Sequence, residues 1–120
     1  MTYTRLFADT NGDSHFEGCT VDMDLVHHAP PAPAPELSQP SETARHVWLR
    51  FPDDREDAAH PSPRRQLCFI LEGIDEGWTS KDETRMFRAR DRLVMEETSG
   101  KGHGARPVQG AALAVTIALE

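Results

Sequence analysis

The sequence has no run of hydrophobic residues long enough to cross a membrane. A membrane-spanning helix needs about 18–20 consecutive apolar residues. The longest apolar run here, residues 111–119, is interrupted by Thr116 and fits a strand better than a helix. The N-terminal residues 1–13 are polar and carry acids, without the basic and apolar regions of a signal peptide. We therefore expect a cytoplasmic protein with no membrane partner.

Cysteine and positive charge are also scarce. The two cysteines, Cys19 and Cys68, form no C-x-x-C pair, and without an export signal we expect free thiols. The 13 Lys and Arg residues are outnumbered by 20 Asp and Glu, which gives a net charge of −7. A phosphate backbone repels such a surface, so nucleic acid is not an expected partner. The arginines at 64–65 and 85–92 predict either a solvated strand face or a patch for an anionic substrate.

No window shows a helical stripe with caps at both ends, whereas strand signals recur along the chain. Short strands separated by Gly, Ser and Asp turns are typical of an all-β sandwich or barrel. The length of 120 residues predicts one domain. The expected strands cover residues 16–23, 46–51, 66–71, 84–87, 92–95 and 113–119.

A proline-rich stretch, residues 29–41, separates the first strand signal from the others. Proline fixes φ and removes a hydrogen-bond donor, so this piece is an extended connector and not a helix. It is either a flexible linker or an ordered strap, and we favour a strap because both flanks look like strands. We therefore expect residues 1–45 to form an N-terminal strand arm and a proline-rich strap packed on the barrel. Residues 46–120 are expected to form the barrel core.

Two segments carry histidines next to turns. In residues 60–73, a histidine in a proline-rich turn leads into a strand that a glycine ends. Alternate side chains of an extended segment share a face. That face would carry His60, Ser62, Arg64 and Gln66. In residues 91–103, a strand is followed by a Gly-rich turn that brings His103 back toward the barrel.

The spacing within these segments resembles the cupin superfamily, in particular its small single-domain members. Gln66 stands seven positions before Gly73, where the family has an acid, and Gly100 precedes His103 by three. The resemblance covers roughly residues 46–119. It implies an all-β, double-stranded β-helix (jelly-roll) barrel with a pocket at its mouth. Here the barrel would have an extended N-terminal arm.

The resemblance also implies a metal site, since many cupins hold a divalent metal with three histidines and one acid. The corresponding residues here are His60, Gln66 and His103, and Ser62 stands nearest to the missing histidine. Iron, manganese, nickel or zinc would accept imidazole and oxygen ligands. This set lacks an anionic ligand and is weaker than two histidines with a carboxylate. The alternative is that the two histidines hydrogen-bond at the barrel mouth without a metal.

Three functions stay open on these residues. The first, which the resemblance implies, is a metal-dependent enzyme of dioxygenase, isomerase or lyase type acting on a small organic molecule, with His60 and His103 as catalytic residues. The second is a non-catalytic module that binds a small ligand and has lost the metal. The third is a structural oligomerisation domain, and we expect a homodimer. The predicted substrate pocket comprises Ser62, Arg64, Trp48 and Phe69.

Overall fold

The computed structural model describes residues 1–54 and 58–119, and the secondary structure of this part consists of strands. No helix in it is long and apolar enough to cross a membrane. The strands are β1 (Thr2–Ala8), β2 (Ser14–Thr20), β3 (Asp24–Leu25), β4 (Glu36–Leu37), β5 (Thr43–Phe51), β6 (Gln66–Glu72), β7 (Ile74–Thr79), β8 (Thr84–Arg88), β9 (Arg92–Met95), β10 (His103–Pro107) and β11 (Ala112–Leu119). The expected all-β fold is confirmed.

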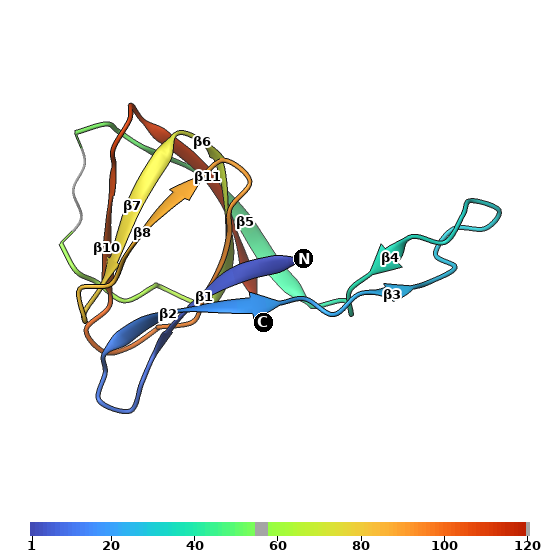
Figure 1. Ribbon diagram of the computed structural model, residues 1–120, viewed down its shortest axis with the longest axis horizontal. Coiled ribbons are helices and arrows are strands. Elements are labelled where there is room, and N and C mark those ends of the chain that lie inside the picture. The colour runs from blue at the N-terminus through green and yellow to red at the C-terminus, as the bar shows by residue number, and fades with distance from the viewer. Residues whose placement is uncertain (55–57, 120) are drawn as a thin grey trace.

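Two sheets face each other and enclose the core (Figure 1). The larger sheet has the strand order β2-β1-β9-β6-β11-β5, and the smaller has the order β10-β7-β8. All named pairings are antiparallel except that of β1 with β9. The buried hydrophobic cluster between the sheets consists of Leu6, Phe16, Cys68, Ile70, Phe87, Leu93 and Ala114.

The six expected strands are present, but β1, β7 and β10 were not predicted. In β7 the side chains alternate between buried and half-buried positions, although its sequence is IDEGWT. An acidic and glycine-containing stretch has low strand propensity, and here tertiary pairing with β8 and β10 overrides it. The polar composition of residues 1–13 did not indicate the strand β1. Its pairing with both β2 and β9 makes it an interior strand of the larger sheet.

Residues 21–42 form a hairpin, which we call the arm, and it projects away from the barrel (Figure 1). Its two short strands pair Asp24 with Leu37 and Leu25 with Glu36. Nearly all of its residues are exposed to solvent. The prediction of a strap packed on the barrel is therefore wrong. Five prolines between residues 30 and 40 remove backbone donors, so this stretch pairs with the barrel sheets poorly.

The boundary drawn between residues 45 and 46 is also wrong. Strands β1 and β2 are integral to the larger sheet, and Leu6 and Phe16 belong to its buried core. The described part of the barrel is therefore made of residues 1–20, which precede the arm, and residues 43–54 and 58–119, which follow it. The arm is an excursion between them and not an N-terminal extension.

Candidate functional site

The barrel contains a cavity of about 410 Å³. This volume lies within the range of pockets that hold small molecules. Its wall is mainly apolar, with side chains from both sheets, among them Leu6, Phe16, Leu49, Phe51, Ile70, Phe87, Leu93 and Met95. The polar lining side chains are Arg45, His60, Ser62, Arg64, Gln66, Asp75, His103 and Thr116.

The two histidine-bearing segments meet at this cavity. Five of the predicted site residues line it: His60, Ser62, Arg64, Gln66 and His103. Pro63 lines the cavity as well, and residues 61–65 are not a strand, so alternation along an extended segment does not account for these positions. Their chemical roles stay predictions. Sequence reasoning missed Arg45, which lies on β5 and lines the exposed side of the same cavity.

The structure does not place Trp48 and Phe69 in the predicted substrate pocket. Neither lines the cavity, because their neighbours Val47, Cys68 and Ile70 do and alternate strand residues point to opposite faces. Trp48 is 66% exposed on β5. Both residues therefore lie on the outer face of the larger sheet. These two aromatic residues were predicted to form pocket walls, but each is next in sequence to the residues that face the cavity and therefore points the other way.

His60 and His103 lie side by side because their backbones are paired. Each backbone amide donates to the other residue's carbonyl, at 2.9 and 3.0 Å, and the two rings have centroids 4.9 Å apart. Gly102 makes this approach possible. Its φ is +75°, and a Cβ atom there would lie 2.1 Å from the carbonyl carbon of His60. Only glycine fits a left-handed position this close to another backbone.

Glu97 is the main residue that sequence reasoning missed. Its side chain is fully buried, and its carboxyl group contacts the hydroxyl of Ser62 and, at 3.1 Å, Nδ1 of His103. The Ser62 amide donates to the Glu97 backbone carbonyl at 3.0 Å and lies 3.3 Å from the carboxyl group. Glu97 thus links both segments in a buried position and fixes the orientation of the His103 ring.

The neighbouring Glu96 points elsewhere. Arg5 donates to its carboxylate at 2.8 Å and Arg65 at 2.9 Å. Burial alone would raise the pKa of Glu96, but these two hydrogen bonds lower it below its usual value. Adjacent residues in an extended chain point apart. Glu96 therefore contacts Arg5 on β1 and Arg65 next to β6, the two strands that flank β9, while Glu97 contacts Ser62 and His103.

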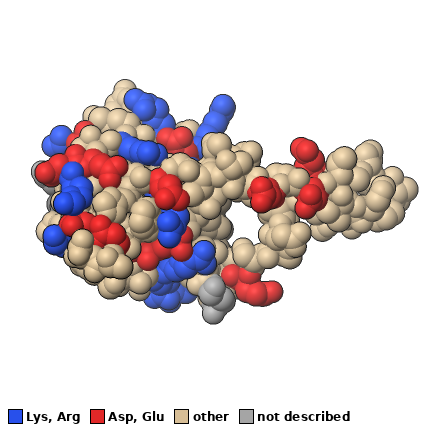
Figure 2. All heavy atoms as spheres, turned by 60° about the horizontal axis from the view of Figure 1, so that its bottom comes forward, with Lys and Arg blue, Asp and Glu red and all other residues tan. Residues whose placement is uncertain are grey.

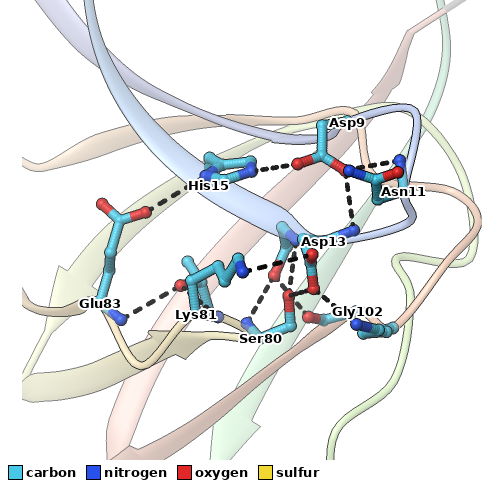
Figure 3. A network of polar contacts seen from close by, with 11 residues as sticks. Asp9, Asn11, Asp13, His15, Ser80, Lys81, Glu83 and Gly102 are labelled. Carbon is cyan, nitrogen blue, oxygen red and sulfur yellow. Dashed lines mark hydrogen bonds and ion pairs between the residues drawn. The ribbon is translucent and has the colours of Figure 1, made fainter.

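A polar network holds the loop that carries His103 (Figure 3). Ser14, which is fully buried, donates from its hydroxyl to the Gly102 carbonyl at 2.6 Å and accepts from the Ser80 amide at 2.9 Å. Asp13 accepts from Ser80 at 3.1 Å and from Lys101 at 2.8 Å. The β1–β2 turn thereby anchors the Gly-rich loop from outside the barrel.

At the outer edge of this network, His15 lies between two acids (Figure 3). Its Nε2 is 2.7 Å from Asp9 and its Nδ1 is 3.5 Å from Glu83. The hydrogen bond with Asp9 raises the pKa of His15 above 6.5 and lowers the pKa of Asp9. His15 therefore supports the turn and not the cavity.

This pair predicts a pH-dependent stability. Because the pKa of His15 is raised in the folded state, its contribution is complete below pH 6.5 and is lost as pH rises through the raised pKa. We expect the melting temperature of the wild type to fall between about pH 6 and about pH 8 more than that of His15→Gln. His28→Gln, on the exposed arm, is the control. Equal pH profiles for wild type and His15→Gln would contradict the assignment.

The predicted metal ligands His60, Gln66 and His103 stay a prediction, and they include no anionic group. Nδ1 of His103 is held by Glu97, and Nδ1 of His60 lies 2.9 Å from the Pro61 carbonyl. The Gln66 amide donates to the Met95 sulfur at 3.7 Å. Over residues 1–54 and 58–119, no three His, Cys, Asp or Glu side chains are grouped as metal ligands. The nearby carboxyl group of Glu97 contacts Ser62 and His103. It therefore does not add an anionic ligand to this set.

Cys68 is the one sulfhydryl in the cavity wall among the described residues. Burial raises the pKa of its thiol to about 12, and the charge of Asp75 adds to this shift. The thiol is therefore protonated at neutral pH and acts as a small apolar surface. It is not a nucleophile for a bound ligand.

Comparison with known proteins places the fold. No family model and no curated protein sequence matches the chain. Among solved structures, the cupin domain of Cnp3 from Schizosaccharomyces pombe aligns with a TM-score of 0.50 and 14% identity, over 89% of this chain and 73% of that one. Protein NMB1881 from Neisseria meningitidis aligns with a TM-score of 0.52 and 14% identity, over 68% and 84%. With two facing sheets around one cavity, the chain has the cupin fold.

Proposed function

We propose that the chain binds a small molecule with an apolar body and an anionic end inside the barrel. The observation that carries this proposal is the distribution of polarity in the cavity wall. The buried lining residues are mainly hydrophobic, whereas the exposed lining residues include Arg45, His60 and Arg64. A ligand of this shape would bury its apolar part and keep its charge at the mouth.

The two arginines suit an anion for electrostatic reasons. Within the described chain, no carboxylate forms an ion pair with Arg45 or Arg64, whereas Arg5, Arg65 and Arg106 each have at least one. A guanidinium binds a carboxylate through two parallel hydrogen bonds. Both arginines are exposed, so they are accessible to a ligand that enters from solvent.

A second function, proton transfer to or from the bound molecule, is favoured by one observation. The carboxyl group of Glu97 lies at Nδ1 of His103 in a buried position, while the His103 ring also lines the cavity. A histidine that donates from Nδ1 keeps its lone pair on Nε2, where it can accept a proton. His103 would then be the general base. This function needs the same ligand site, so binding is tested first.

Binding is tested with octanoate and octanol, which share an eight-carbon chain and differ in charge. By titration calorimetry we expect octanoate to bind about tenfold more tightly than octanol, as a hydrogen-bonded charge contributes about 1.5–3 kcal/mol. The double variant Arg45→Gln, Arg64→Gln should lose this preference. Arg50→Gln, on the same strand but facing away from the cavity, should keep it. Ala105 lines the cavity, so Ala105→Trp narrows it and should weaken the binding of both ligands.

Three results would count against this proposal. Binding that Ala105→Trp leaves unchanged would place the ligand outside the barrel. Equal affinities for octanoate and octanol would remove the role of the arginines. Stoichiometric iron, manganese, nickel or zinc that is lost in His60→Ala and His103→Ala would favour the metal-dependent enzyme. Deuterium loss next to the carbonyl of a bound keto acid, abolished by His103→Gln, would add proton transfer to binding.

A further inference from the structure

The outer face of the larger sheet is unusually apolar. Register pairs Trp48 with Val115 and Val115 with Phe69, which places the three side chains in one row across β5, β11 and β6. The next row contains His46, Ile117 and Leu67. Side chains of one row lie about 4.5–5.5 Å apart at Cβ and form a continuous surface. We call this surface the outer face.

The exposure of this surface is greatest on β5. Strand β5 is at the edge of the sheet, and each of its residues from Thr43 to Trp48 is exposed. Trp48 and Leu25 are the two most exposed large hydrophobic residues in the described chain, at 66% and 73%. An apolar edge strand is normally covered, because unpaired strand edges and large apolar patches favour association.

The arm has complementary properties. It carries Asp22, Asp24, Glu36 and Glu42 but no Lys or Arg, whereas β5 carries two arginines, one histidine and no acid. None of the arm acids forms an ion pair within the described chain. In Figure 2 the projecting arm shows acidic and uncharged spheres, and the Lys and Arg spheres lie on the barrel. The arm also exposes Met23, Leu25 and Val26.

We propose that the arm of one copy docks on the β5 side of the outer face of a second copy, and that the contact is reciprocal. The apolar side chains of β3 would cover Trp48, and the arm acids would face His46 and Arg50. The arm starts where β2 ends and finishes where β5 begins. A twofold axis next to β5 therefore allows both arms to exchange at once, which gives a closed dimer.

Light scattering on the wild type should give twice the chain mass of 13.4 kDa. The arm variant Asp24→Lys, Glu36→Lys and the strand variant His46→Glu, Arg50→Glu should each weaken the dimer at least about tenfold, because each homodimer then contains two repulsive contacts. An equimolar mixture should form heterodimers, seen by native mass spectrometry. In the heterodimer the altered arm meets the altered strand, and the native arm meets the native strand.

Asp53→Lys, Asp54→Lys matches the charge change of the arm variant and should leave the dimer intact. All six changed positions are exposed, and unchanged melting temperatures of the three double variants would verify folding. A monomeric wild type would overturn the proposal. A dimer that both variants leave unchanged would also overturn the proposal. The outer face of one copy would then be covered by a sheet of the second copy and not by its arm. Mixing that yields no heterodimer would exclude the reciprocal arm contact.

Discussion

Gly102→Ala should destabilise the protein by about 3–5 kcal/mol, which is a large part of the stability of a small domain. Two costs combine. An alanine at a left-handed φ of +75° costs roughly 1–2 kcal/mol. Its Cβ would also lie between 2.1 and 2.4 Å from backbone atoms of His60 and Pro61, and overpacking of this kind costs about 1–3 kcal/mol. Backbone atoms cannot rotate away as a side chain can, so the upper part of the range applies.

Urea unfolding of two control variants separates these costs. Gly110→Ala has a φ of +68° but no atom within 4 Å of the new Cβ, so only the conformational cost is expected. Gly18→Ala has neither a positive φ nor a close neighbour, and little change is expected. If Gly102→Ala is no worse than Gly110→Ala, the close contact between His60 and Gly102 does not exist in solution.

Glu97→Ala is the second large effect, with an expected loss of about 3–5 kcal/mol of unfolding free energy. The substitution removes a fully buried carboxyl group and leaves the Ser62 hydroxyl and the His103 ring nitrogen without this partner. Each unsatisfied buried group costs about 1–3 kcal/mol, and the deleted side chain leaves a void. The measurement is again urea unfolding.

Glu97→Gln keeps the shape of the side chain and should lose less unfolding free energy than Glu97→Ala. The amide oxygen of the glutamine can still accept one of the two hydrogen bonds. Glu72→Ala, at an exposed position at the end of β6, controls for removal of a glutamate and should change stability by less than about 0.5 kcal/mol. Equal losses for Glu97→Ala and Glu72→Ala would show that Glu97 is not buried between the two segments. The His103 ring signals in NMR spectra should shift in both Glu97 variants.

The meeting of the two histidine segments was predicted from the resemblance to the cupin superfamily, and that resemblance rests partly on the positions of glycines. Gly73 and Gly100, which gave the motif spacing, both have positive φ, and a Cβ at either would lie within 2.6 Å of a backbone oxygen. Such requirements are readable in the sequence. The length and composition of the strands likewise predicted the all-β fold.

The predictions of the pocket walls and of the proline-rich strap were wrong, and Glu97 was missed. These features depend on where a strand begins and on which strand it pairs with. The inward parity of β5 and β6 is set by pairing with β11, so Trp48 and Phe69 were assigned to the wrong face. Glu97 follows the end of β9, and alternation says that it and Glu96 point to opposite faces but not which of the two points inward. Its direction is decided by Ser62 and His103, which are 35 and 6 residues away in sequence. The arm could not be placed because its composition specifies an extended chain but not its neighbour.

The parallel pairing of β1 with β9 has a consequence for the order in which the chain assembles. Leu6 lies opposite Met95, and the hydroxyl of Ser14 donates to the carbonyl of a residue 88 positions later. During synthesis the β1–β2 hairpin is made first, but its other neighbours emerge from the ribosome only near the end of translation. Contacts between residues so far apart make folding slow, on the scale of milliseconds to seconds for barrels of this kind. The residues of the hairpin therefore lack β9 and the Gly-rich loop, the partners that complete the barrel around them, until late in synthesis.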